Sequence, residues 1–497
     1  MSRHRNASSG DIELMTITGI RVVAPSMVQV NEEFSLGVKV LCEPYPVGAA
    51  CYERLPAVIG RFNQSPRGIM YMDNVPKEWR GTVGIDGGDG YSGPTSFSFA
   101  TGAGPYGDDP RPIRRIPGIR FTTPGIKFIR LTDPNSGLVG IANPIEVTAS
   151  APAERLYWGD LHSQTFFSDG LRCPEELYSF ARDEAFLNIF ALADHSESLT
   201  DRQWDYFVAV TNDFNTPDQF ATLIGFEWTS RKWGHRNVYY PTDAGPIWRC
   251  TDSVMGDLPN LYQAAREHRA LLIPHHSANA EMGVDWTLGH DPEVERLVEI
   301  YSVWGNSERP AAQGNSRPIR AHGGEKSGQH VVDALQRDYR FGFVGGGDIH
   351  DGRPGDDLHA LQESPSGYRL LWPQGIMAVR APRLTRAAIF HALWNRRSYA
   401  TSNIRPLVRF ELDGAPMGSF VQARSPLRFF VRVISEKALA AVTLVKDGND
   451  YRSLPAGGCV VEETFTEKAD RRPATYYVRI QRSDGEMGWS SPIWLEE

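Results

Sequence analysis

The chain is poor in the features that mark several large classes of protein. Its five cysteines (42, 51, 173, 250 and 459) are odd in number and form no CxxC pair. The sequence therefore predicts neither a disulfide framework nor a structural zinc site built from cysteines. The longest apolar runs, such as ALLI and IFALA, fall far short of the roughly 20 residues that a membrane-spanning helix needs. We expect no membrane segment and a reducing, cytoplasmic location.

The sequence also lacks a basic run, and we expect no signal peptide. The 497 residues carry a net charge of −8 and no Lys/Arg-rich run, which argues against a nucleic-acid partner. Residues 1–10 are polar, lack the apolar core of a signal peptide and are expected to be disordered. The partner that remains is a small-molecule substrate, and a homo-oligomer stays open.

The length predicts several domains. Residues 11–150 and 404–497 are rich in short strands and turns, and we expect a β-sandwich in each. In the second segment, Asp-Gly pairs in LDGAP, VKDGND and RSDGE supply the positive φ that tight hairpins need. Residues 127–147 are expected to form two strands around a Pro-Asn-Ser-Gly turn.

Residues 151–403 differ, because strand-like and helix-like stretches alternate there. PEELYSFARDEAF begins with Pro174, a good first helical residue, and LPNLYQAAREHRA and LTRAAIFHALWNRR are also expected to be helical. NIFALADH, LLIPHH, RLVEIYS and FGFVGGGDIH each predict a strand that runs into a polar loop. This alternation favours an α/β domain with parallel strands, in which chemistry gathers on loops at the strand ends.

Metal-ligating residue types concentrate on these loops. Seven of the 13 histidines lie in the loops or just beyond them: His162, His195, His235, His275, His276, His350 and His359. With the acidic residues and one amide, the candidate metal ligands are Asp160, His162, Gln164, Asp169, His195, Glu227, His235, His276, Asp348 and His350. Each motif alone is also compatible with a turn or a buried polar pair. Together, carboxylates and imidazoles favour divalent Mn, Zn or Fe, with two or three ions per chain.

The series DLHSQT…SDG, ADH, GFEW, GHRN, PHHS and GGDIH resembles the PHP (polymerase and histidinol phosphatase) superfamily of metallohydrolases. The start WGDLH, the segment VEIYSVWG and the ending DIHDGRPG are most similar to a large uncharacterised branch related to carbamate-cleaving members of the CehA/McbA type. The resemblance covers about residues 155–420. It implies a PHP-type distorted (β/α)7 barrel between the two β-sandwiches.

The same resemblance implies a division of the ligands. His162, Glu227 and Asp348 would hold one ion, and Glu227 would bridge to a second ion on His235 and one of His275 and His276. Asp169, His195 and His350 would match a third site. Gln164 stands where the family has a second histidine, and its amide oxygen is the weaker ligand. Asp160 is a possible substitute for it.

Two neighbouring divalent ions can share a hydroxide and polarise a scissile bond, so no Ser or Cys nucleophile is required. The predicted function is therefore a metallohydrolase that cleaves a phosphoester, ester, carbamate or amide bond of a small organic substrate. Asp194 is expected to orient a ligand imidazole or move a proton, with a loop cap as the alternative. Whichever of His275 and His276 does not bind metal, with His275 as the choice made here, would donate to the leaving group. Arg353 would clamp a phosphate or carboxylate unless it pairs with a nearby aspartate.

Two other functions remain open at this point. A metal-assisted lyase acting on a small molecule would use the same ligands. A non-catalytic ligand- or glycan-binding protein with a structural metal is also compatible with the sequence, and Gln164 in the HxQ motif is its main support.

Overall fold

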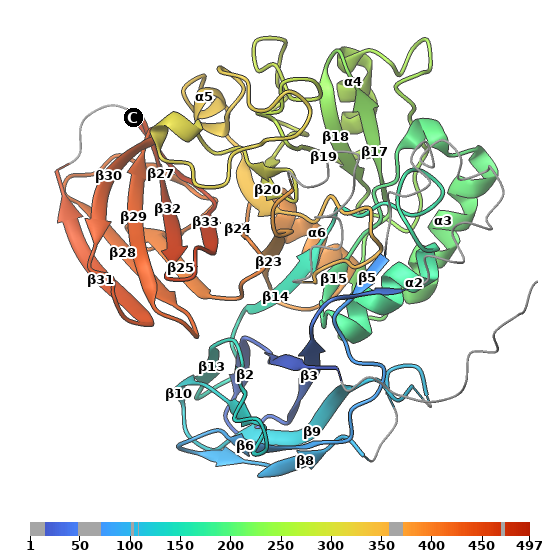
Figure 1. The fold of residues 1–497 in the computed structure, drawn as a ribbon. Coiled ribbons are helices and arrows are strands. Elements are labelled where there is room, and N and C mark those ends of the chain that lie inside the picture. The colour runs from blue at the N-terminus through green and yellow to red at the C-terminus, as the bar shows by residue number, and fades with distance from the viewer. Residues whose placement is uncertain (1–14, 48–70, 101–103, 108, 357–370, 469–472) are drawn as a thin grey trace, which may run out of the picture.

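A computed structural model describes residues 15–47, 71–100, 104–107, 109–356, 371–468 and 473–497. Figure 1 shows the N-terminal strands at the bottom, the C-terminal strands at the left and the central part above and between them. No helix among the described residues combines the length and the apolar character needed to cross a membrane. Residues 1–10, which we expected to be disordered, lie outside the described residues, and so does His359.

The N-terminal part is built from short strands. They form the sheets β1-β3-β9-β7, β10-β13-β2 and β12-β11-β6-β8, and the pair β4-β5. Side chains alternate along β3 and β9, and Val38, Val40, Ile119 and Phe121 meet in one buried cluster. The strands are β1 (Ile17–Val23), β2 (Met27–Gln29), β3 (Phe34–Cys42), β4 (Tyr45–Val47), β5 (Tyr71–Asp73), β6 (Thr82–Asp86), β7 (Tyr91–Ser92), β8 (Ser96–Ser98), β9 (Ile113–Phe121), β10 (Gly125–Lys127), β11 (Arg130–Thr132), β12 (Val139–Ile141) and β13 (Ile145–Thr148).

The central part mixes strands and helices. Its elements are β14 (Arg155–Asp160), α2 (Pro174–Ser179), the π-helix η1 (Phe180–Glu184), β15 (Ile189–Phe190), the 3₁₀ turn η2 (Ser196–Ser198), α3 (Asp201–Phe214), β16 (Ala221–Thr222), β17 (Gly225–Ser230), β18 (Gly234–Tyr239), α4 (Leu258–His268), β19 (Leu271–Pro274), β20 (Leu297–Ser302), β21 (Gly305–Asn306), the 3₁₀ turn η3 (Ala311–Gln313), α5 (Val331–Leu335), β22 (Gly342–Gly345), β23 (Ile376–Ala381), α6 (Arg386–Trp394) and β24 (Ser398–Thr401). The strands β17 to β20 and β22 are buried along their whole length, apart from Thr229 in β17.

The C-terminal part consists of strands alone among the described residues. These are β25 (Leu407–Leu412), β26 (Ala415–Pro416), β27 (Phe420–Gln422), β28 (Leu427–Ile434), β29 (Leu439–Lys446), β30 (Asn449–Leu454), β31 (Val460–Glu467), β32 (Ala474–Arg482), β33 (Met487–Ser490) and β34 (Ile493–Glu496). Phe410 and Val431 of the sheet β26-β25-β28-β31 share a buried cluster with Leu444 and Val478 of the other sheet. Along strands such as β28, buried side chains alternate with more exposed ones, and the buried side chains of both sheets form this shared core.

Several sequence predictions are confirmed. Helix α2 begins at Pro174, α4 covers the LPNLYQAAREH stretch, and α6 begins after Thr385, whose hydroxyl accepts from the Ala388 amide. The Asp-Gly turns at 413–414 and 447–448 have positive φ at both residues, as tight hairpins require. Residues 127–147 differ from the prediction, because four strands rather than two run through this region.

Hydrogen bonding in the central part does not form one closed (β/α)7 ladder among the described strands. β14, β15 and β16 are parallel, but β23 joins β14 antiparallel, and β17, β18 and β19 form a separate antiparallel sheet. β20 and β22 pair in parallel in a third sheet. The first sheet continues through β24 into β33, so one hydrogen-bonded sheet extends from the central part into the C-terminal part. Among the described strands, only the parallel pairs β14-β15, β15-β16 and β20-β22 therefore agree with the predicted barrel.

Candidate metal centre

Backbone hydrogen bonds join the loops that carry the predicted ligands. The amide of Asp348 donates to the carbonyl of His162 (2.7 Å), and the amide of Gln164 donates to the carbonyl of Ile349 (3.0 Å). The amide of Glu227 donates to the carbonyl of Asp194 (2.9 Å), which places His195 beside Glu227. These bridges join the loops after β14, β15 and β22 to one another and to β17, so candidate ligands far apart in the sequence converge.

Glu227 lies at the middle of the convergence. Its Oε1 is 2.8 Å from Nδ1 of His235 and 3.0 Å from Nε2 of His275. These three residues and His276 form a buried group whose ligand atoms lie within 4.8 Å of one another. The other oxygen, Oε2, is 3.5 Å from Nε2 of His162. The two carboxylate oxygens of Glu227 therefore face different sets of ligands.

A second group contains His162, His275 and Asp348, all buried and again with ligand atoms within 4.8 Å. Nε2 of His162 is 3.4 Å from Oδ1 of Asp348. On the opposite side of the ring, Nδ1 is 3.1 Å from the carboxylate of Glu299 in β20. Burial lowers the pKa of His162, but Asp348 and Glu299 outweigh burial and hold this pKa well above its usual value.

The third group is more open to solvent. Oδ2 of Asp169 is 3.1 Å from Nε2 of His195 and 3.3 Å from Nε2 of His350, and the side chains of Asp169 and His195 keep 19% and 15% of their exposure. Nδ1 of His195 is hydrogen-bonded to the hydroxyl of Thr229. Because the ligands of the other two groups are nearly inaccessible, this side is the mouth of the centre.

The pKa shifts show how strongly these side chains act on one another. Burial raises the pKa of Glu227, but His195 and His275 reverse the effect and hold it well below its usual value. Burial likewise raises the pKa of Asp169, but His195 and His350 hold it below the ordinary range. Carboxylates that stay charged while buried need positive charge beside them, which protonated imidazoles or a divalent cation can provide.

The donor atoms fit a divalent cation. Nδ1–H of His162 can donate to Glu299, which leaves the Nε2 lone pair directed at Asp348 and Glu227; carboxylate–imidazole pairs of this kind fix the tautomer of metal-binding histidines. Among the described side chains, buried atoms at the centre without a hydrogen-bond partner are His162 Nε2, Gln164 Oε1, His275 Nδ1, His276 Nδ1, Asp348 Oδ2 and His350 Nδ1. Mixed imidazole and carboxylate donors suit Zn, Mn or Fe.

Comparison with known proteins gives relatives without an assigned activity. Residues 173–309 match the model of a family described as a protein of unknown function, DUF3604. An uncharacterised protein of Chlamydia pneumoniae is 28% identical to the chain over 403 residues, and one of Chlamydia trachomatis serovar D is 30% identical over 404 residues. Each alignment covers 77% of this chain and 64% of the relative, so the chain spans less than two thirds of the length of these relatives.

One solved structure is also similar over much of the chain. It is a two-domain protein from Bacteroides vulgatus containing a predicted PHP-like metal-dependent phosphoesterase, 15% identical, covering 69% of this chain and 96% of that chain. The TM-score of 0.37 is too low to assign a fold or a function. The chemistry of the centre therefore has to be argued from the chain's own residues.

Three predicted site residues support the ligands instead of joining the three groups. Asp160 accepts hydrogen bonds from the amides of His162 (2.9 Å) and Gly347 (2.8 Å), so it holds these two loops together, and it belongs to none of the three groups. Nε2 of Gln164 donates to Glu227 (3.1 Å) and Asp348 (3.3 Å). The amide nitrogen of Gln164, and not its oxygen, thus faces the ligand carboxylates.

Asp194 is buried behind the loop that carries Asp169. Its Oδ1 accepts from the amide and hydroxyl of Thr165 (3.0 and 2.8 Å) and from the hydroxyl of Ser168 (2.7 Å). Burial raises its pKa to about 6, although these hydrogen bonds oppose the shift. These contacts match the loop-capping alternative.

The substrate clamp predicted for Arg353 is corrected by its surroundings. Its guanidinium is fully buried and binds Asp73 (2.9 Å), the side-chain oxygen of Asn74 (2.9 Å) and Asp356. A buried guanidinium needs such acceptors, and here they come largely from the N-terminal part. Arg353 therefore ties the loop after His350 to the segment that begins at β5.

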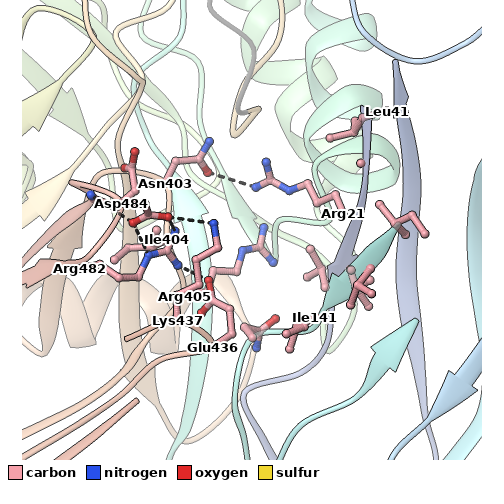
Figure 2. A pocket seen from close by; sticks show the side chains of 18 of the residues that line it. Arg21, Leu41, Ile141, Asn403, Ile404, Arg405, Glu436, Lys437, Arg482 and Asp484 are labelled. Carbon is pink, nitrogen blue, oxygen red and sulfur yellow. Dashed lines mark hydrogen bonds and ion pairs between the residues drawn. The ribbon is translucent and has the colours of Figure 1, made fainter. Parts of the chain in front are cut away.

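A cavity of about 440 Å³ lies elsewhere, between β1, β12, residues 402–405 and two C-terminal turns (Figure 2). None of the predicted site residues is among the described residues that line it. Lys437 and Arg482 on one wall donate to Asp484 (2.9 and 2.7 Å), and Arg21 on the other donates to Asn403 (3.2 Å). The cavity marks a junction between the N- and C-terminal parts, away from the metal centre.

Sequence reasoning missed Glu299 and the glycines beside it. A glutamate within the wholly buried strand VEIYS is the signal that could have identified Glu299. A Cβ on Gly346 would lie 2.0 Å from Oε2 of Glu299, and one on Gly347 would lie 2.6 Å from Oδ2 of Asp160. Gly346 and Gly347 of the GGGD sequence are thus required by close packing against buried carboxylates, beyond any role in a turn.

Proposed function

We propose that this protein is a metal-dependent hydrolase of the PHP type that uses two or three divalent cations, Mn, Zn or Fe. The observation that carries the proposal is the placement of Glu227, whose two oxygens face separate ligand sets. A carboxylate in that position can bridge two cations, and His275 belongs to both of the buried groups. We also propose that the chemistry belongs to residues 151–403, between sandwich-like parts at 11–150 and 404–497.

Cations bound in pairs lower the pKa of a coordinated water and polarise the bond to be cleaved. The residues of the chain would then hold and orient the ions. His162 would bind through Nε2 while Glu299 fixes its ring, and Gln164 would keep Glu227 and Asp348 in place. His275, predicted as a proton donor, is better placed as a ligand, because its Nε2 already faces Glu227.

A phosphoester of a small organic molecule is the first choice of substrate, because phosphoryl oxygens can distribute their negative charge over two or three cations. An ester, carbamate or amide is the second. Trp304 supports an organic substrate, since its ring lies 6.4 Å from the ring of His276 and 6.2 Å from that of His350. Trp228 and Trp286, by contrast, are fully buried in the core.

The experiment supplies metal-freed protein with Mn or Zn and offers p-nitrophenyl phosphate beside aryl esters and aryl carbamates. We expect metal-dependent turnover of the phosphate, and loss of that activity in His195→Ala, because a ligand of the open group is removed. His268→Ala, at an exposed position in α4, is the matched control. Tight binding of one chelator-resistant ion without turnover of any substrate would contradict the proposal and favour a structural metal.

A further inference from the structure

His322 lies at the mouth of the metal centre without belonging to any ligand group. Its side chain is 43% exposed, and its ring centroid is 5.0 Å from that of Trp304. Trp304 in turn packs near His276 of one group and His350 of another. The indole therefore packs near both a solvent-accessible imidazole and members of two groups of proposed ligands.

The loop that carries His322 is anchored on the ligand segment itself. The amide of Ala280 donates to the carbonyl of Gly324 (2.9 Å), and the amide of Lys326 donates to the carbonyl of Ala278 (2.7 Å). Nδ2 of Asn279 donates to the carbonyl of Ala321 (3.3 Å). Residues 278–280 follow His275 and His276 after a single residue, Ser277, so the backbone that carries His322 is held relative to these proposed ligands.

The backbone of His322 is strained. Its φ is +49°, and Gly323 and Gly324 continue in the same region at +82° and +80°. Residues with a Cβ disfavour this conformation, although histidine adopts it more often than most. Such strain persists where the surrounding structure enforces it, and it gathers at functional sites.

The charged groups that act on the imidazole of His322 are Glu281, which lies beside it, and members of all three ligand groups. Burial lowers the pKa of His322; Glu281 and Asp348 act against this shift, while His350 and His235 add to it. Nδ1 of the ring is 3.9 Å from the carboxylate of Glu281. A lowered pKa reduces the share of imidazolium present at neutral pH, but it makes each imidazolium a stronger proton donor.

We propose that His322 contacts the substrate and donates the proton that the leaving oxygen needs, an inference that rests on the proposed hydrolase function. Water forms the new bond to phosphorus or to the acyl carbon, and the bond from that atom to the leaving oxygen breaks. The imidazolium N–H of His322 transfers its proton to that oxygen. The proton released by the attacking water returns the imidazole to its charged form, so the overall reaction consumes only water. His275, held by Glu227, is then free of this task.

The test compares substrates that differ in their need for an acid. p-Nitrophenyl phosphate has a good leaving group and phenyl phosphate a poor one; if the wild type prefers carboxyl-derived substrates, the matching aryl ester or carbamate pair is used. His322→Asn removes the imidazole and keeps a side chain that tolerates positive φ. We expect about a 10²-fold loss of kcat on the phenyl substrate, a loss below tenfold on the p-nitrophenyl substrate, and unchanged metal content.

His322→Gly, which also accepts the backbone conformation, is the second variant, and added imidazole should restore part of its rate on the phenyl substrate. His391→Asn, at an exposed position in α6, is the control. Equal loss on both substrates, no loss on either, or loss of bound metal would overturn the role of His322 and leave the hydrolase proposal standing. A wild type that turns over neither series overturns the proposed function itself, and the role of His322 with it.

Discussion

Glu299 determines which nitrogen of His162 is available at the centre. The carboxylate is buried in β20 and lies 3.1 Å from Nδ1, while Nε2 faces Glu227 and Asp348 at 3.5 and 3.4 Å. Because a carboxylate accepts the Nδ1 proton, the ring is held with Nε2 ready to bind a cation. At the scale of single residues, we therefore expect the cation affinity of the candidate centre to depend on a side chain outside the three groups.

Replacing Glu299 with Gln tests this dependence. The amide keeps the shape of the side chain but is a weaker acceptor for the Nδ1 proton, so we expect about a 10- to 100-fold loss in Mn or Zn affinity and in kcat/KM. Competition with a coloured chelator measures the affinity. Glu293→Gln, at an exposed position before β20, should match the wild type; an unchanged affinity in Glu299→Gln would show that Glu299 does not support the ligand.

The three groups of side chains that the structure brings together are drawn from residues that the sequence analysis named as site residues. Roles that depend on contacts between distant segments were less predictable. The amide of Gln164 is oriented by Glu227 and Asp348, and Arg353 is bound by Asp73, some 280 positions away in the chain. The sequence around a residue does not show which distant residues will contact it.

At the scale of elements, β18 is fixed by an ion pair next to a ligand. Arg236 follows His235, and its Nε is 2.5 Å from Oε1 of Glu295, whose other oxygen is 2.9 Å from Nδ1 of His290. Burial raises the pKa of Glu295, but Arg236 and His290 reverse this shift and lower it to about 2 from 4.5. The pair thus connects the antiparallel sheet β17-β18-β19 to the segment before β20.

The low pKa of Glu295 predicts an acid-dependent loss of stability. The folded protein keeps this carboxylate charged, whereas the unfolded chain protonates it near pH 4.5, so the stabilisation is complete above pH 4.5 and is lost as pH falls toward 2. By linkage it amounts to on the order of 3 kcal/mol. We expect the free energy of unfolding to fall less steeply between pH 4.5 and 2 in the double variant Arg236→Met, Glu295→Gln than in the wild type.

The double variant avoids leaving one buried charge without its partner. Denaturant unfolding followed at several pH values gives the slopes, and Glu293→Gln serves as the control for loss of an exposed carboxylate. Identical slopes in the double variant and the wild type would show that the pKa of Glu295 is not lowered by folding.

Helices with strong end signals were predictable, as Pro174 at the start of α2 shows. Helix α3 was not predicted, although Thr200 and Gln203 form a capping box at its start. The antiparallel order of β17, β18 and β19 was also missed, because pairing direction depends on register between segments and not on composition. The sequence thus predicted where strands lie better than it predicted which strands pair with one another.

At the scale of the whole molecule, the N-terminal part supports the open side of the centre. Lys39 of β3 lies 3.2 Å from Asp356, with both side chains fully buried, and Asp73 binds Arg353. These contacts hold the loop that follows His350. Because β24 also pairs with β33, both flanking parts are joined to the part that carries the ligands.

Anomalous diffraction from crystals grown with Mn tests the central claim most directly. The account predicts at least two peaks, one among Glu227, His235, His275 and His276 and another beside Glu227 at His162 and Asp348, each about 2 Å from its ligand atoms. A third peak is expected between Asp169, His195 and His350. Density for Mn outside these groups, with none inside them, would contradict the account.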